Sequence, residues 1–389
     1  MSGGRLEISL KPSVLRWARE RVGLAPEALA KKIGVKPERV RDWEGSGRIS
    51  ISQADRLAHH TRTPLGYLYL PEPVEDRLPI PDFRTLTDQA PPSPSPELLD
   101  SIQLMQRRQA WFRDELIESG QEPLGFVGSL GLSTPVEQAA DTVRDTLRLE
   151  RTWASRQPTW TEALRHLRDR IEAAGILVVF NGVVGNNTHR TLDPAEFRGF
   201  VLVDEHAPLL FVNGADYKSP QMFTLAHELA HIWIGQGGVS NFDLVRPPSH
   251  EVERFCNLVA AEILVPEREL RAAWKTIAAS AEPYEAVARR FKVSTLVAAR
   301  RALDLELIGR RAFFKFYEEW EQDERRKQNV QSEGGSFWNN QNVRIGRRFG
   351  AAVVRAVSEG RLLYREAYGL TGLKGKTFDE FARQVGAEL

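Results

Sequence analysis

The spacing of apolar residues over positions 1–70 predicts a set of short helices. In KPSVLRWARERVG the apolar side chains recur at helical spacing. They form one face of the predicted helix, with Val14, Leu15, Ala18 and Val22. APEALAKKIGV and KPERVRDWEGSG each open with a proline near the helix start and end close to a glycine. ISQADRLAHHT predicts a further helix, with Ser52 as its N-cap. We therefore expect an all-α domain over residues 1–70.

Prolines interrupt this pattern, and a second helical region follows them. PEPVEDRLPIPDFRT and QAPPSPSPE hold many of the 22 prolines of the chain. Because proline fixes φ and removes a backbone donor, we expect a linker or an extended strap over residues 71–97. Helical spacing then returns in LLDSIQLMQRRQAWFRDELIESG, VEQAADTVRDTLRLE and WTEALRHLRDRIEAAG.

Three short apolar runs predict strands in the middle of the chain. ILVVF (176–180) is a buried strand, and FRGFVLVD (197–204) and APLLFVN (207–213) form a pair joined by a short acidic turn. Helical patterns dominate the chain after these strands. We therefore expect an α+β domain over residues 98–310 with a small, mostly antiparallel sheet, and a helical C-terminal extension over residues 311–389.

Composition excludes several kinds of site and indicates a compartment. The 389 residues include one cysteine, Cys256, so neither a disulfide framework nor a four-thiolate zinc site can form within the chain. No apolar run approaches the length of a membrane span, and the N-terminal MSGGRLEISLKPS lacks the apolar core of a signal peptide. We expect a cytoplasmic protein with no membrane partner, and the sequence leaves its oligomeric state open.

The segment SPQMFTLAHELAHIWIG (219–235) combines a helix start, a helix end and a set of metal-binding residue types. His227 and His231 are four residues apart, so on a helix of about 100° per residue both imidazoles can reach one metal ion. Glu228 lies beside them, where it can act on a water molecule at that ion. HExxH on an apolar helix is typical of a zinc peptidase, and two unrelated surface histidines are the alternative.

A catalytic zinc ion needs a third protein ligand, which the next predicted helix, HEVERFCNLVAAEILVP (250–266), can supply. Glu253 and Glu262 are nine residues apart and therefore point to opposite sides of a straight helix. We favour Glu253 as the ligand and keep Glu262 as the alternative, while an exposed salt bridge would account for either residue without a metal. Asn257 shares a face with Glu253 and can orient a ligand or a ligating histidine.

The N-terminal region carries a charge that suits nucleic acid. Residues 1–70 contain 13 Lys and Arg and 7 Asp and Glu, a net charge of +6, whereas the whole chain has +1. In a helix-turn-helix, KPERVRDWEGSG would enter the major groove after APEALAKKIGV. The predicted DNA contacts come from Lys36, Arg39, Arg41 and Arg48. Three acidic residues of the same helix oppose DNA readout, namely Glu38, Asp42 and Glu44, and a protein-docking or dimerisation domain is the alternative.

A fainter helix-turn-helix pattern occurs in YEAVARRFKVSTLVAARRALDLELI (284–308). This stretch is basic at Arg289, Arg290, Lys292, Arg300 and Arg301. A subdomain that packs against the rest of the α+β domain explains the pattern equally well, so both interpretations stay open.

The motifs together resemble the ImmA/IrrE family of metallopeptidases. FTLAHELAH, the later ExxCNxxAAEILVP pattern and the strand pair before the helix carry this resemblance. The N-terminal region resembles the XRE-type helix-turn-helix domain often fused to such peptidases, and LPIPDFRT and GGSFWNNQNVRIGRRFG resemble the long form of that fusion. The resemblance implies a zincin-like core with Glu228 as catalytic base and three zinc ligands, His227, His231 and Glu253.

The resemblance also implies a function. Members of the family cleave protein substrates, typically a helix-turn-helix repressor, and so switch genes on after stress or DNA damage. We expect a zinc-dependent endopeptidase, with Mn2+ as a substitute in vitro, that cleaves a repressor or an antitoxin. Tyr217 and His250 are open candidates for stabilising the oxyanion. The alternative is a DNA-binding regulator or antitoxin with a sensory or structural zinc domain, although a structural site has no need of the base Glu228.

Overall fold

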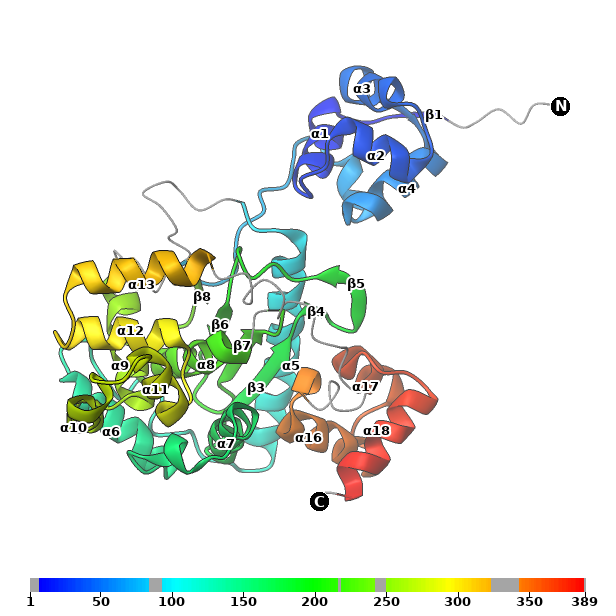
Figure 1. Ribbon diagram of the computed structural model, residues 1–389. Coiled ribbons are helices and arrows are strands. Elements are labelled where there is room, and N and C mark those ends of the chain that lie inside the picture. The colour runs from blue at the N-terminus through cyan, green and yellow to red at the C-terminus, as the bar shows by residue number, and fades with distance from the viewer. Residues whose placement is uncertain (1–6, 84–92, 216–217, 242–249, 323–342, 388–389) are drawn as a thin grey trace. The chain divides into compact units, whose positions relative to one another are not determined.

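The computed structural model divides into two compact units (Figure 1). Unit 1 comprises residues 1–79 and 92–100, and unit 2 comprises residues 80–91 and 101–389. Within them the structure describes residues 7–83, 93–215, 218–241, 250–322 and 343–387. In these ranges no helix combines the length and the apolar character that a membrane crossing requires.

Unit 1 is built mainly from short helices, as the apolar spacing predicted. Its helices are α1 (Pro12–Glu20), α2 (Pro26–Ile33), α3 (Pro37–Ser46), α4 (Ile51–Thr61) and the 3-10 helix η1 (Leu65–Tyr69). β1 (Glu7–Ser9) pairs antiparallel with β2 (Arg48–Ser50). Prolines in the first turn of α1, α2 and α3, and left-handed glycines after α2 and α3, set the lengths of these helices.

Two junctions in unit 1 depend on single residues. The N-cap of α4 is Ser50 and not the predicted Ser52, because the Ser50 hydroxyl accepts a hydrogen bond from the Gln53 amide while the Gln53 side chain accepts one from the Ser50 amide. Gly47 ends α3 with φ 74°, and a Cβ there would lie 2.1 Å from the Leu10 carbonyl oxygen. The turn from α3 into β2 therefore requires glycine.

Unit 2 contains a mixed sheet with the strand order β3-β7-β6-β8. These strands are β3 (Leu177–Asn181), β6 (Gly199–Leu202), β7 (Leu209–Asn213) and β8 (Val239–Ser240). β3 and β7 are parallel, whereas β6 runs antiparallel to both β7 and β8. The three predicted strands are present as β3, β6 and β7, and all of their residues are buried.

The sequence did not predict β8, nor the small hairpin of β4 (Val183–Val184) and β5 (Asn187–Thr191). Two-residue strands and the exposed, polar β5 show no hydrophobic period, which explains why they were missed.

Helices enclose this sheet. Before it come α5 (Pro96–Glu118), α6 (Val136–Leu147), the 3-10 helix η2 (Trp153–Arg156) and α7 (Trp160–Ala173). After it come α8 (Lys218–Ile234), α9 (Glu251–Leu264), α10 (Glu267–Ile277), α11 (Pro283–Phe291), α12 (Thr295–Asp304) and α13 (Arg310–Gln322). Figure 1 shows α8 to α12 on one side of the sheet, and α8 contacts β6, β7 and α9. One hydrophobic core therefore joins the sheet to the helix that carries the HExxH motif.

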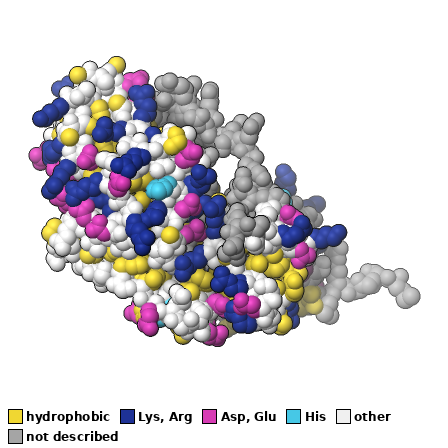
Figure 2. All heavy atoms as spheres, turned by 90° about the horizontal axis from the view of Figure 1, so that it is seen from below, with side chains coloured by type: hydrophobic (Ala, Val, Ile, Leu, Met, Phe, Trp, Pro, Cys, Tyr) yellow, Lys and Arg dark blue, Asp and Glu magenta, His cyan; other side chains and the backbone are white. Residues whose placement is uncertain are grey.

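The C-terminal helices form a small layer beside α5. They are α16 (Arg347–Ser358), α17 (Tyr364–Thr371) and α18 (Lys376–Ala387), and α16 contacts both of the others. Buried Arg108 of α5 donates hydrogen bonds to the carbonyl oxygens of Leu370 and Arg344, at 2.8 and 2.9 Å. On the face seen in Figure 2, basic and acidic side chains are interspersed, as suits a chain with a net charge of +1.

Candidate metal centre

Helix α8 places both histidines of the motif in the interior. His227 and His231 are fully buried, and their Nε2 atoms are 3.2 Å apart. The other faces of the helix are apolar and pack into the core through Met222, Leu225, Leu229, Ile232 and Trp233. This packing fixes the direction in which the two imidazoles point.

Glu253, in the first turn of α9, brings a carboxylate to the two imidazoles. Its Oε2 lies 3.2 Å from His227 Nε2, its Oε1 lies 3.1 Å from His231 Nε2, and the side chain is buried. Burial alone would raise the pKa of Glu253, but its contacts with His227 and His231 outweigh burial and hold that pKa well below its ordinary value. The ionised form is therefore the stable one at this position.

The donor groups of His227, His231 and Glu253 are spaced as ligands of one ion. Metal bonds of about 2.0–2.1 Å at tetrahedral angles separate neighbouring donors by about 3.3 Å. The two Nε2 atoms are 3.2 Å apart, and the two oxygens of Glu253 lie 3.2 Å from His227 Nε2 and 3.1 Å from His231 Nε2, one oxygen to each ring. All three side chains are buried. Two imidazole nitrogens and a carboxylate at these distances fit a divalent metal ion.

Hydrogen bonds on the far side of each imidazole orient it. His227 Nδ1 lies 2.9 Å from the side-chain oxygen of Asn257, and His231 Nδ1 lies 2.9 Å from the Gln236 carbonyl oxygen. Because both partners are acceptors, each Nδ1 carries a proton, which leaves Nε2 as the ring atom that would bind the ion after losing any proton of its own. Asn257 thus lies where the sequence placed it. The Gln236 carbonyl was missed, because a backbone acceptor leaves no signal in residue types.

Glu228 lies beside the three donors and is fully buried. Neither of its carboxylate oxygens has a hydrogen-bond partner among the described residues. Burial, together with the charge of Glu253, raises the pKa of Glu228 well above its ordinary value, and the nearby Ser240 hydroxyl opposes this shift without reversing it. Buried polar groups are rarely left without a partner, so this carboxyl group is available to a water molecule or a substrate.

Two residues of the sheet shape this site and were not predicted. A Cβ on Gly199 of β6 would lie 2.6 Å from Glu228 Oε1, so glycine leaves the space that the glutamate side chain fills. The Ser240 hydroxyl of β8 approaches Glu253 Oε1 at 3.5 Å. A glycine and a serine in strands carry no recognisable signal in the sequence, because their role arises only when the sheet meets α8 and α9.

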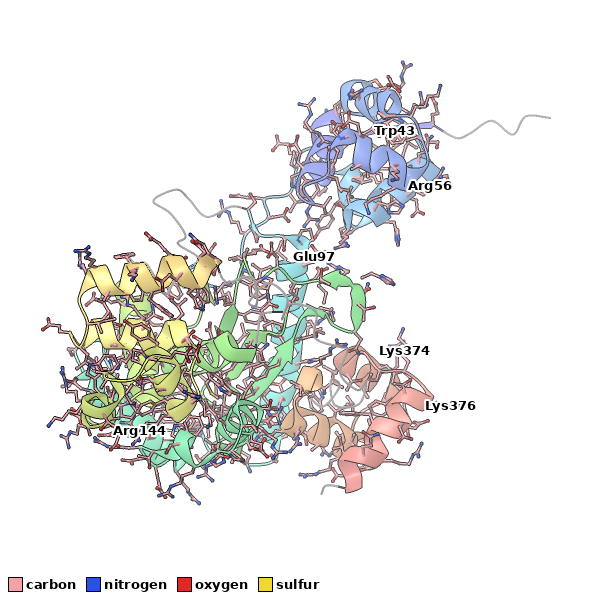
Figure 3. The ribbon with its side chains drawn as sticks, viewed as in Figure 1. Trp43, Arg56, Glu97, Arg144, Lys374 and Lys376 are labelled. Carbon is pink, nitrogen blue, oxygen red and sulfur yellow. The ribbon has the colours of Figure 1, made fainter. Side chains whose placement is uncertain are left out.

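Glu262, the alternative ligand, has other partners. It forms an ion pair with Arg301 and accepts hydrogen bonds from the Glu267 amide at 3.1 and 3.2 Å. Arg144, labelled in Figure 3, donates to the Glu262 carbonyl oxygen at 2.8 Å. The structure therefore brings Glu253, and not Glu262, to the two histidines.

Of the two candidates for an oxyanion donor, the structure describes only His250. Tyr217 lies outside the described residues. His250 is exposed at the start of α9, with its ring centroid 5.0 Å from that of Phe83. Phe83 in turn stacks on the ring of His231, with 5.7 Å between centroids and 17° between planes. Phe83 therefore covers one side of the histidine pair.

Comparison with known families matches three parts of the chain. Residues 171–303 match the model of a peptidase family described as the IrrE N-terminal-like domain, and residues 15–68 match a helix-turn-helix model. The chain carries an IrrE N-terminal-like domain and an N-terminal helix-turn-helix domain. Residues 345–384 match a domain of unknown function, and comparison with curated proteins gave no match. The family resemblance and the α+β fold class predicted from the sequence are confirmed.

The helix-turn-helix domain exposes the basic side chains predicted to contact DNA, Lys36, Arg39, Arg41 and Arg48. Arg39 pairs with Asp42 at 3.1 Å, and Arg41 pairs with Glu27. Exposed pairs of this kind contribute little to stability, so both guanidinium groups can exchange their partners for phosphates. Trp43, labelled in Figure 3, is fully buried in the core of this domain, as expected.

Glu44 was predicted to oppose DNA readout, but its side chain is buried and does not face the surface of the predicted recognition helix. Its side chain turns into the interior of the helix-turn-helix domain, where it accepts hydrogen bonds from Arg19 at 2.6 and 3.0 Å. The pair neutralises a buried charge and joins α1 to α3. Of the three acidic residues in the predicted recognition helix, Glu38 and Asp42 are exposed.

The fainter helix-turn-helix pattern lies within the IrrE N-terminal-like domain, where it forms α11 and α12. Apolar residues of both helices, among them Val287, Phe291 and Val297, are buried in the core that also holds α8. Arg301 is buried against Glu262. These contacts support the interpretation of this stretch as a packing subdomain.

Proposed function

We propose that the IrrE N-terminal-like domain is a zinc-dependent endopeptidase with Glu228 as its general base and three zinc ligands, His227, His231 and Glu253. The observation that carries the proposal is the buried carboxyl group of Glu228, which lacks a hydrogen-bond partner among the described residues. A structural zinc site fills its four positions with protein ligands and needs no base. Here three donors converge and a potential base lies next to them.

The protein side chains have separate tasks in this mechanism. A bound zinc ion would supply Lewis acidity and acidify a water molecule, and Mn2+ could replace it in vitro. Glu228 accepts a proton from the attacking water and later gives it to the leaving amine. Asn257 and the Gln236 carbonyl keep the imidazoles aligned.

We further propose that the substrate is a protein, a helix-turn-helix repressor or an antitoxin, cut during a stress or DNA-damage response. Support comes from the resemblance to ImmA/IrrE peptidases and from the helix-turn-helix domain in the same chain. A domain of this kind suggests DNA binding, which would bring the peptidase to the places where repressors reside.

The central test compares Glu228→Gln with Glu251→Gln, an exposed glutamate on α9 that serves as the matched control. Zinc content is measured first, and candidate repressors encoded nearby are then incubated with each protein, with and without single-stranded DNA. Glu228→Gln should keep its zinc and lose cleavage by about 100-fold or more, whereas the control should resemble the wild type. Full cleavage by zinc-loaded Glu228→Gln would refute the assigned base.

A second function, DNA binding by the helix-turn-helix domain, is favoured by the exposure of its four basic candidates, Lys36, Arg39, Arg41 and Arg48. Alanine at any of them should weaken binding to duplex DNA, and each lost phosphate contact should reduce the salt slope by about one. Lys374→Ala, an exposed lysine in unit 2, is the control. Binding that ignores salt and all four substitutions would favour protein docking instead.

A further inference from the structure

A short segment before α5, residues 80–83, extends the sheet of unit 2 at its outer edge; we call it the strap. Asp82 forms a parallel bridge with Val239 of β8. The Phe83 amide donates to the Val239 carbonyl oxygen, and the Val239 amide donates to the Pro81 carbonyl oxygen, both at 2.9 Å. β8 also pairs with β6, so the strap occupies the backbone edge that β8 would otherwise present.

The strap ends over the metal centre. The Phe83 ring stacks on His231 and approaches His250, which precedes α9. Phe83 is itself buried, with 9% of its surface exposed. The strap therefore covers the His231 side of the three donors with an aromatic ring and the sheet edge with its backbone.

Gly238 is the residue that permits this docking. A Cβ at that position would lie 2.4 Å from the Phe83 ring and 2.9 Å from the Pro81 carbonyl oxygen. Because glycine has no side chain, the strap can lie directly on the backbone before β8. A single methyl group at position 238 would therefore push the strap away without touching a metal ligand.

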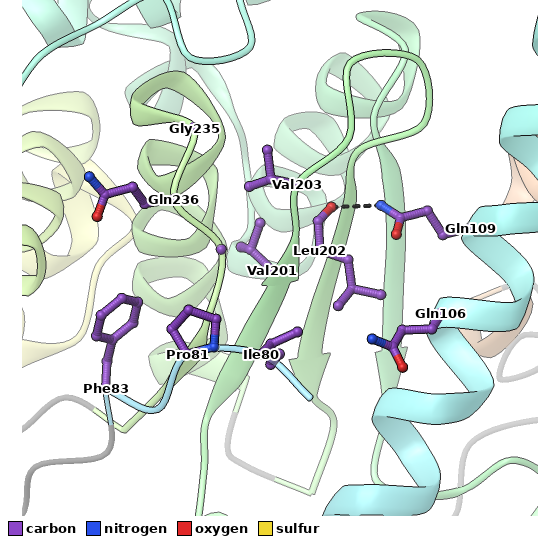
Figure 4. Close-up of a pocket in the computed structure, with 11 residues that line it drawn as sticks. Ile80, Pro81, Phe83, Gln106, Gln109, Val201, Leu202, Val203, Gly235 and Gln236 are labelled. Atoms are coloured by element: carbon purple, nitrogen blue, oxygen red, sulfur yellow. Dashed lines mark hydrogen bonds between the residues drawn. The ribbon is translucent and has the colours of Figure 1, made fainter. Parts of the chain in front are cut away.

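The opposite flank of the strap is open. A pocket of about 430 Å³ lies between it and α5, lined by Ile80 and Phe83 from the strap, Val201 and Val203 from the sheet region, and Gln106 from α5 (Figure 4). A permanent inner strand would be packed on both sides. The strap instead has room beside it, and its only paired residue in β8 among the described residues is Val239.

We propose that the strap is an internal occupant of the sheet edge, which an extended peptide must displace before it reaches the metal centre. The inference rests on the proposed peptidase function. Any extended peptide offers the same backbone donors and acceptors as the strap, so it can form the same bonds to Val239. Displacement moves Phe83 off His231, and the strap thereby restrains cleavage until a suitable substrate arrives.

The experiment uses the full-length chain with Gly238→Ala, and Gly125→Ala as control, since a Cβ on Gly125 meets no atom within 4 Å. In metal-free protein, hydrogen exchange at the Phe83 and Val239 amides is measured. In zinc-loaded protein, the rate of zinc transfer to a chelator and the hydrolysis of an unstructured fluorogenic peptide are measured. Gly238→Ala should raise exchange about tenfold or more and raise zinc transfer and hydrolysis several-fold.

A second variant tests the proposal if Gly238→Ala does not fold. Phe83→Ala keeps the backbone pairs but removes the ring from His231, so it should also speed zinc transfer, with a thermal melt to show that the protein is folded. Unchanged zinc transfer in both variants would overturn the proposal, as would full exposure of the Phe83 amide in the wild type. If no protein hydrolyses the peptide, the peptidase function fails, while exchange and zinc transfer still decide the role of the strap.

Discussion

Glu253 and Glu262, at opposite ends of α9, are both buried but are compensated in different ways. Glu262 faces the guanidinium group of Arg301, a permanent cation within the protein. Glu253 faces two histidines, which are neutral when they bind a metal through Nε2. A buried carboxylate needs a compensating charge. The protein supplies that charge as a permanent cation at Glu262, whereas at Glu253 a bound metal ion would supply it.

Removing the carboxylate charge at the metal end tests this difference most strongly. Glu253→Gln should lower zinc affinity by about 1,000-fold or more, because one anionic ligand is lost, and cleavage should disappear with the metal. Affinity is measured by competition with a fluorescent chelator. Glu262→Gln is the matched control and should bind zinc as the wild type does. Equal affinities for the two variants would erase the distinction between the ends of α9.

Removing the carboxylate of Glu262, at the other end of α9, should lower stability and leave zinc affinity unchanged. Glu262→Ala leaves Arg301 buried without its partner and should lower the free energy of unfolding by about 3–5 kcal/mol. Urea denaturation of the metal-free protein measures this change. Zinc stoichiometry of the folded variant should stay as in the wild type. A change below about 1 kcal/mol would mean that water or another group compensates Arg301.

Changing Asn257, the residue that orients His227, should have a smaller effect on zinc affinity. Asn257→Ala removes the acceptor at His227 Nδ1 and should weaken zinc binding by about 10–100-fold. Asn257→Asp keeps an oxygen acceptor and should restore most of the affinity, which a merely structural role for Asn257 would not predict. The same chelator competition measures both variants.

The smallest effects should appear in the pH dependence of stability of the metal-free protein. The pKa of Glu253 is lowered, so its contribution is present above its ordinary value of 4.5 and is lost as the pH falls below it. Burial raises the pKa of Glu262 above 4.5, so its contribution is complete below that value and is lost as the pH rises. The urea midpoint of unfolding is measured against pH for both variants. Glu253→Gln should flatten this profile below pH 4.5, and Glu262→Gln should flatten it above pH 4.5. Identical profiles for both variants would contradict these opposite shifts.

The sequence by itself determined the parts that depend on local geometry. His227 and His231 lie on one helix face because their spacing matches the helical repeat, and nine residues separate Glu253 from Glu262 by half a rotation. The same arithmetic placed Asn257 on the face of Glu253, and the structure shows it at His227 Nδ1. Proline and glycine marked the short helices of unit 1, because their backbone preferences act within one turn.

Only the tertiary structure decided the contacts between distant segments. The Gln236 carbonyl, the space at Gly199, the inward turn of Glu44 and the strap over His231 all arise where separate elements meet. β8 and the strap pair through backbone atoms, which every residue type except proline offers in full. Such contacts leave no pattern in the order of residues, because they depend on which surfaces the folded chain brings together.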